Sequence, residues 1–202
     1  MQKHTEQSIL DNARKHFIQK GYAATRTQDI ADDAGINKAM LHYYFRSKEK
    51  LYQEVISYTL AEVLPRIASA MTAQGTFFER IEHLVSTYVE TIIDHPEMPL
   101  FVMYELSQKR EGFIIEMKKH AAFFPAIQSF FEQMNKEVEA GKIRDIPPIH
   151  LILNILGMTV FPFMAKPVIS NIFDVPDEQF EILMKERKEI IIDFITNSLK
   201  LD

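Results

Sequence analysis

The side chains best suited to contact a polyanion gather in one short stretch within the first quarter of the chain. Lys38 and Lys48 carry ammonium groups that can neutralise phosphates, and His42 and Tyr43 can donate hydrogen bonds to phosphate oxygens. Gln28 is long enough to reach the edge of a base. The chemistry that this stretch could perform is contact with a nucleic-acid backbone and its bases.

Three neighbouring residues complete this candidate surface. Ala39 is small and would let a helix approach a base pair closely, whereas Met40 can make an apolar contact with a thymine methyl group. The hydroxyl of Thr27 would lie beside the free N–H groups at the start of a helix, which attract phosphate. The predicted DNA-binding residues are therefore Thr27, Gln28, Lys38, Ala39, Met40, His42, Tyr43 and Lys48.

Local signals place these side chains on two short helices joined by a tight turn. Thr27 can cap a helix over residues 28–34, with Asp29 near its positive end. Gly35 tolerates the positive φ that a tight turn needs. Asn37 can cap a further helix over residues 38–45.

The helix over residues 38–45 has an inner and an outer face. Leu41 and Phe45 are four residues apart and should face inward, whereas residues 38–40, 42 and 43 should face outward. Such a helix can enter the major groove of DNA, which is wide enough to admit it. An earlier helix ends at Gly21.

The remaining chain favours helices throughout. Ser47 caps a helix that begins at Lys48, and further helices are predicted over residues 77–93, 99–109, 113–140, 149–163 and 177–199. Pro162 and Pro167 should kink or end the helix before the last one. We predict an all-α protein of about nine helices. Residues 1–47 would form a three-helix, helix-turn-helix DNA-binding domain, and residues 48–202 would form a helical effector-binding and dimerisation domain.

Composition and charge are compatible with a modular DNA-binding protein. The chain has 202 residues, 47% of them hydrophobic, no cysteine and a net charge of −5. Its first fifty residues nevertheless hold nine basic and six acidic side chains, so the head is basic and the body acidic. We expect a cytoplasmic protein, because no secretory signal is evident and the apolar segment 149–163 is too short to span a bilayer.

Catalysis is not expected from this sequence. It contains no G-x-G-x-x-G, G-x-S-x-G or H-E-x-x-H motif and no cysteine nucleophile, and its histidines have no metal-ligand spacing. We therefore predict that the protein is not an enzyme and uses no metal or cofactor.

The stretch TRTQDIADDAGINKAMLHYYFRSKEKL, residues 25–51, resembles the DNA-binding signature of the TetR family of bacterial regulators. That signature combines a D-I-A core, an A-G-hydrophobic turn, an aromatic cluster that ends the recognition helix, and a Ser-Lys-Glu-x-Leu start of the next helix. The family commonly has a small residue and then threonine where Ala39 and Met40 stand, and tyrosine where His42 stands. These departures leave the fold assignment intact but make the operator unpredictable.

The resemblance implies a sequence-specific transcription regulator, acting as a repressor that a small hydrophobic effector releases. It also implies a homodimer joined by the last two long helices, which would bind a near-palindromic operator in double-stranded DNA. Residues 149–163 agree with this, because a helix that is apolar on nearly all faces needs two buried faces. The alternative is a protein of the same fold that has lost DNA binding and acts through protein contacts.

The body is rich in Phe and Met, which pack cores and also suit a pocket for an apolar molecule. We expect such a pocket among the helices of residues 51–71, 77–93, 99–109 and 113–140. The predicted lining residues are Phe101, Tyr104, Phe123 and Phe124. The competing interpretation is that these side chains only fill the core.

Overall fold

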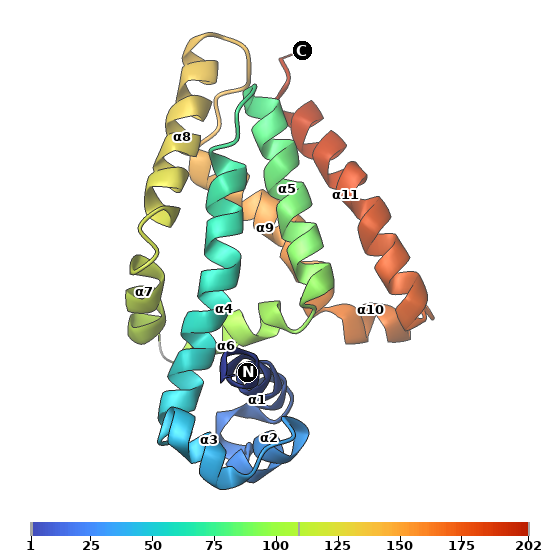
Figure 1. Cartoon of the computed structure of the whole chain (residues 1–202). Helices are drawn as coiled ribbons and strands as arrows, with labels where there is room; N and C mark the ends of the chain where they lie inside the picture. Colours follow the sequence, from blue (N-terminus) through green and yellow to red (C-terminus); the bar gives the residue numbers. More distant parts are fainter. Residues whose placement is uncertain (1, 109, 202) are drawn as a thin grey trace. The chain divides into compact units, whose positions relative to one another are not determined.

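The computed structural model describes residues 2–108 and 110–201, and within these ranges the chain is helical with no strand. It holds eleven helices there, whereas the sequence predicted about nine (Figure 1). Their bounds are α1 Gln2–Ala24, α2 Thr27–Asp33, α3 Lys38–Phe45, α4 Lys48–Met71, α5 Phe77–Asp94, α6 Met98–Gln108, α7 Arg110–Lys118, α8 Phe123–Glu139, α9 Pro148–Met164, α10 Lys166–Ile172 and α11 Asp177–Leu199.

The chain divides into two compact units. The first, called the head unit here, is Met1–Glu62 with Met103–Met117, and the second, the body unit, is Val63–Val102 with Lys118–Asp202. The division falls inside α4 and inside α6, so each of these helices contributes to both units. The domain boundary expected after residue 47 falls in the turn before α4, within the head unit.

The turn between α2 and α3 forms as predicted from its residue types. Gly35 has a φ of 69°, and the side chain of Asn37 accepts a hydrogen bond from the backbone N–H of Met40 at 2.8 Å. The Ser47 hydroxyl likewise accepts the N–H of Lys50 at 3.1 Å and caps α4. These three local signals are confirmed.

Two expectations about the ends of the first helices need correction. Thr27 is the first residue of α2 and not its cap, because the preceding Arg26 is the extended N-cap and makes no side-chain cap bond. Gly21 interrupts α1 with a φ of 73°, but one more helical turn follows it up to Ala24.

The core of the head unit draws on each of its first four helices. Ile9, Ala13 and Phe17 of α1 are buried, as are Ile30 of α2 and Leu41 of α3. Further buried residues complete this core: Leu10, Ala31, Phe45, Leu51, Tyr52 and Val55. The packing leaves one face of α3 free, as the sequence predicted.

The body unit is built on the mutual packing of α5, α9 and α11. Phe163 of α9 and Phe180 of α11 meet edge to face at 5.9 Å between ring centroids, in a cluster that includes Ile92 of α5. On another side α5 contacts α8 through Phe77 and Phe130, whose ring centroids lie 5.2 Å apart. Buried aromatic pairs of this kind add to the stability that area burial provides.

The single helix predicted over residues 113–140 is in fact two helices, α7 and α8, with a break at residues 119–122. Pro125 explains the break, because proline is tolerated in the first turn of a helix but not in its interior. The sequence also missed α10. Pro167 lies in the first turn of this short helix, which begins at Lys166 and is bent by 66° from α9, so the break expected at Pro167 is confirmed. Pro162 instead lies inside α9, which continues to Met164.

None of the individual helices in the described part of the chain is long and apolar enough to cross a membrane. The bent pair of α9 and α10 would pass a test of length and composition if the two helices were taken together.

We predict that Gly35→Ala lowers the free energy of unfolding by about 1 kcal/mol, because alanine is strained at positive φ. An added Cβ would meet no atom within 4 Å, so backbone strain is the only expected cost. Gly112→Ala is the matched control: Gly112 lies in α7 with the same open surroundings and no positive φ. Alanine there should be neutral or stabilising. Urea unfolding at one fixed protein concentration measures both variants, and equal effects would contradict the strain argument.

Candidate nucleic-acid interface

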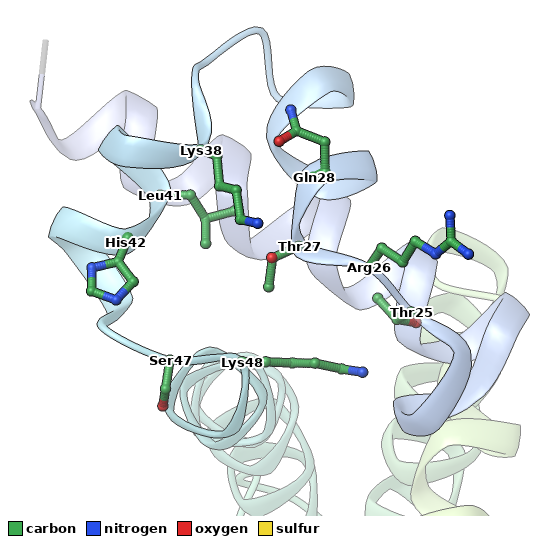
Figure 2. A pocket seen from close by; sticks show the side chains of 9 residues that line it. All are labelled: Thr25, Arg26, Thr27, Gln28, Lys38, Leu41, His42, Ser47 and Lys48. Carbon is green, nitrogen blue, oxygen red and sulfur yellow. The ribbon is translucent and has the colours of Figure 1, made fainter.

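A hollow with a volume of about 440 Å³ opens on the head unit between α2, α3 and the start of α4. Figure 2 shows its lining, which comes from the link after α1, from these three helices and from Ser47 in the turn before α4. The lining residues are Thr25, Arg26, Thr27, Gln28, Lys38, Leu41, His42, Ser47 and Lys48. Three permanent cations and several hydroxyl and amide groups therefore face one hollow.

Five of the eight predicted contact residues line this hollow: Thr27, Gln28, Lys38, His42 and Lys48. The other three, Ala39, Met40 and Tyr43, lie beside it on the exposed face of α3, where Tyr43 keeps 64% of its surface accessible. The local sequence thus brings all eight residues to one region of the head unit. Sequence analysis did not include Thr25, Arg26 and Ser47 among the contact residues. Arg26 could have been included, because it is a positively charged residue directly before α2.

Two lining side chains are held by neighbours. The ammonium group of Lys48 donates to the carbonyl of Ala23 at 3.2 Å and lies 4.6 Å from the ring centroid of Tyr22. The amide of Gln28 donates to a carboxylate oxygen of Asp32 at 2.7 Å. Lys48 is therefore positioned before any ligand arrives, whereas Gln28 would have to exchange its partner to reach a base.

Two of the three acidic residues of α2, Asp29 and Asp33, contact side chains of α1. Lys20 Nζ lies 2.9 Å from Asp29 Oδ2, and this ammonium group lowers the pKa of the Asp29 carboxyl. Nε2 of the buried His16 lies 2.7 Å from Asp33 Oδ2. The Lys20–Asp29 pair offsets part of the negative charge that would otherwise repel a polyanion from the α2 side of the hollow.

A buried polar pair lies within the head unit, and sequence analysis did not predict it. The hydroxyl of Tyr52, on α4, donates to the carboxylate of Glu105, on α6, and both residues are only 1% exposed. The other carboxylate oxygen of Glu105 has no hydrogen-bond partner among the described residues. Burial, followed by this carboxylate, raises the pKa of Tyr52 above its ordinary value of 10.0.

Aromatic rings connect this buried pair to the hollow. The Tyr52 ring centroid lies 4.8 Å from that of Phe17 and 4.8 Å from that of Tyr22, and Lys48 lies over Tyr22. A continuous series of contacts therefore runs within the head unit from Glu105 to a cation of the hollow.

The four predicted effector contacts differ in burial and in the unit to which they belong. Phe101 and Phe123 are buried, whereas Tyr104 and Phe124 are exposed. Phe123 and Phe124 belong to the body unit and stack edge to face at 5.5 Å, and Phe101 belongs to the same unit. Tyr104 lies in the head unit.

The geometry of the head is that of a helix-turn-helix protein: two short helices in a tight turn, with an exposed second helix beside a cationic hollow. Residues 9–55 match the family model described as "Bacterial regulatory proteins, tetR family". The head of this chain is therefore similar to the DNA-binding region of the TetR family, whose members are transcriptional regulators.

Several relatives extend the similarity beyond the head. The probable HTH-type transcriptional regulator YttP of Bacillus subtilis is 26% identical over 175 residues, which cover 83% of this chain and 81% of that protein. The biofilm-operon negative regulator IcaR of Staphylococcus aureus is 30% identical over 130 residues, 64% of this chain and 65% of that one. The uncharacterized regulator YuxN of Bacillus subtilis matches over only 62% of its own length, at 26% identity and 85% coverage of this chain.

Solved structures confirm the fold along the whole chain. The hemolysin II transcriptional regulator HlyIIR aligns over 100% of both chains with a TM-score of 0.68 and 24% identity. The ketosteroid transcriptional regulator KstR2 of Mycobacterium tuberculosis aligns over 98% of this chain and 95% of that one, with a TM-score of 0.70 and 20% identity.

We predict that the unfolding free energy declines with pH above about 10 less steeply in Tyr52→Phe than in the unchanged protein. A tyrosine whose pKa is raised on folding stabilises the folded state below its unfolded pKa, and this contribution is lost as pH rises through the folded pKa. Urea unfolding across pH 9 to 12 measures the two slopes. Because the slopes and not the absolute values are compared, the cost of removing the hydroxyl at neutral pH does not affect the result. Equal slopes would contradict the raised pKa.

Proposed function

We propose that this protein is a sequence-specific DNA-binding transcription regulator whose recognition helix is α3. The observation that carries this proposal is the cationic hollow between α2, α3 and α4, next to the exposed outer face of α3. Arg26, Lys38 and Lys48 supply the charge that a phosphate backbone requires. α3 supplies a surface narrow enough for the major groove.

The residues divide into two roles. Lys38, Lys48 and His42 line the hollow and would bind phosphates, together with the hydroxyl of Thr27. Base contacts would come from Gln28 at the start of α2 and from the outer face of α3, where Ala39 permits close approach and Met40 offers an apolar surface. Tyr43 is exposed enough to reach either a phosphate or a base edge.

We propose a homodimer formed through α9 and α11. Both helices expose large apolar side chains although other faces of them are buried in the body unit: Ile149, Leu153, Phe161, Ile182, Leu183, Ile190 and Phe194. A soluble protein rarely leaves so many large apolar side chains on two helices in water, which supports an interface with a second copy. Two heads in one dimer would read a near-palindromic operator.

Repression that is released by a small hydrophobic effector is the form of regulation we favour. IcaR is named a negative regulator and KstR2 a repressor, and a structure of KstR2 is described as a ketosteroid transcriptional regulator. The alternative is a protein of this fold that has lost DNA binding and acts through protein contacts. The DNA experiment below separates the two.

We predict that Lys38→Ala and Tyr43→Ala each weaken binding to the operator by about tenfold, because each removes one contact worth roughly 1–2 kcal/mol. Fluorescence anisotropy with duplexes from the DNA upstream of the protein's own gene, against a scrambled duplex, provides the measurement. In a salt series Lys38→Ala should reduce the salt slope by about one unit.

Lys142→Ala is the control for this experiment, since Lys142 is an exposed lysine of the body unit that pairs with Glu137. Its affinity for DNA should not change. If neither the upstream duplexes nor a genome-wide selection of bound DNA yielded selective binding, the alternative function would replace the proposed one.

We predict that Phe194→Glu converts the dimer to a monomer and reduces operator affinity by at least tenfold. A carboxylate at the centre of an apolar interface would be buried without a partner. Sedimentation velocity measures the mass, and anisotropy measures the affinity. Ile115→Glu is the matched control, because Ile115 is about as exposed as Phe194 but lies on α7 of the head unit. A dimer that persists in Phe194→Glu would contradict the proposed interface.

A further inference from the structure

Lys48 differs from the other two permanent cations of the hollow. Arg26 and Lys38 are exposed, whereas Lys48 is half-buried and is the first residue of α4. The N-terminus of a helix carries a partial positive charge, so a lysine at this position is unfavourable for its own helix. Groups with partial negative charge from outside α4 are therefore needed to hold the ammonium group there.

The end of α1 provides those groups. The carbonyl of Ala23 accepts a hydrogen bond from the Lys48 ammonium at 3.2 Å, and the same ammonium lies over the ring of Tyr22, 4.6 Å from its centroid. A carbonyl oxygen and the face of an aromatic ring both present negative charge to a cation. Two consecutive residues of α1 thus hold one ammonium group.

Tyr22 is itself fixed in place. Its ring centroid lies 6.0 Å from that of Phe17 and 4.8 Å from that of Tyr52. Its hydroxyl is hydrogen-bonded to the Glu49 carboxylate, and this bond raises the pKa of the hydroxyl above its ordinary value. Because Lys48 and Glu49 are consecutive, the start of α4 contacts Tyr22 both at the ring face and at the hydroxyl.

An interruption in α1 precedes this arrangement. Gly21 has a φ of 73°, which breaks the regular helix directly before Tyr22. The hydroxyl of the buried Thr25 shares its hydrogen bond between the carbonyls of Gly21 and His16, at 2.8 Å and 3.0 Å. The irregular end of α1 is therefore fixed by its own contacts and does not depend on a ligand.

We propose that Tyr22 is a positioning residue for DNA binding, which holds the Lys48 ammonium group in place for a phosphate and acts on DNA only through that lysine. Fixing a long, flexible side chain in advance removes the entropy cost of ordering it when DNA binds. This inference rests on the proposed DNA-binding function and adds a residue that is not among the predicted contacts.

The Lys48 ammonium can meet a phosphate without leaving its present position. An ammonium group has three N–H donors, and the Ala23 carbonyl takes one of them. The ring of Tyr22 attracts the charge as a whole and needs no particular donor. Lys48 therefore differs from Gln28, whose amide must first leave Asp32.

Fluorescence anisotropy with the operator duplex tests the proposal. We expect Tyr22→Leu to weaken binding by about twofold to tenfold, which corresponds to the cost of ordering one lysine side chain. Its salt slope should stay unchanged because the cation is still present, whereas Lys48→Ala should reduce the slope by about one unit. Tyr22→Phe keeps the ring and should bind nearly as tightly as the unchanged protein.

A double variant shows whether Tyr22 acts through Lys48. Adding Tyr22→Leu to Lys48→Ala should cause little further loss, since the side chain that Tyr22 positions is gone. Tyr58→Leu is the matched control. Tyr58 is also half-buried in the head unit and also lies under a cation, Arg14, at 5.6 Å, but Arg14 is not among the residues that line the hollow. Tyr58→Leu should leave the affinity unchanged.

The positioning can also be observed without DNA. In the full-length protein with isotopically labelled lysine, the ε-methylene protons of Lys48 should resonate upfield of those of other lysines, because an aromatic ring shields protons above its face. The Lys48→Ala variant identifies the signal. The upfield shift should vanish in Tyr22→Leu and persist in Tyr22→Phe. Thermal melting followed by circular dichroism checks that each variant is folded.

Three results would overturn the inference: a Lys48 signal without the upfield shift, a Tyr22→Phe variant that binds DNA tenfold more weakly, or a Tyr22→Leu variant whose loss of affinity is absent or is equally large in the Lys48→Ala background. Failure of the proposed function gives a different result. The unchanged protein would then bind no duplex selectively although its Lys48 signal is shifted, and the role of Tyr22 in DNA binding would fall with that function.

Discussion

Helices of seven and eight residues are too short to be stable in water by themselves, and this constraint governs the head of the protein. Because α2 and α3 gain little from their own hydrogen bonds, their angle and position depend on what they bury. Ile30 and Leu41 bury almost completely, and Gly35 allows the chain to turn between them. The exposed face of α3 is therefore presented by a core formed mostly from α1 and α4, and changes in those longer helices must reach it.

The link between that core and α6 is polar, which is unusual for a position so deeply buried. The Tyr52 hydroxyl satisfies one oxygen of Glu105, but the second oxygen has no partner among the described residues. A partly satisfied buried carboxylate favours one arrangement strongly and is costly in any other. An effector that shifts α6 within the head unit would break this pair, and the ring contacts of Tyr52 with Phe17 and Tyr22 would transmit the change toward Lys48. Coupling between α6 and Lys48 requires a contact that can exist in two states. The buried hydrogen bond between Tyr52 and Glu105 can provide them, because it is either formed or broken.

How far the sequence predicts this structure depends on the range of the interactions involved. Asn37, Gly35 and Ser47 act on atoms within three residues of themselves, and all three were predicted correctly. The break between α7 and α8 was missed because apolar spacing continues across it, and the effect of Pro125 on the preceding turn was not weighed against that pattern. Thr27 was predicted to be the N-cap of α2, but it is the first helical residue. The N-cap is Arg26, whose extended backbone angles decide where the helix begins. The burial of Glu105 could not be predicted from the sequence. A glutamate on a predicted helix is expected to be solvated unless its partner on another helix, here Tyr52, is known.

The body unit leaves two kinds of interaction unused, and they differ in physical character. The exposed Leu153 and Phe194 are unfavourable in water only through their apolar area, so any sufficiently apolar and complementary surface would relieve them. The Thr91 hydroxyl is buried without a partner in the described part of the chain, and its cost is directional, because only a group that places a hydrogen-bonding atom within reach of it would relieve it. The exposed apolar surface suits a second protein, whose large area provides affinity. It therefore corresponds to the second copy that the proposed regulator would need in addition to DNA.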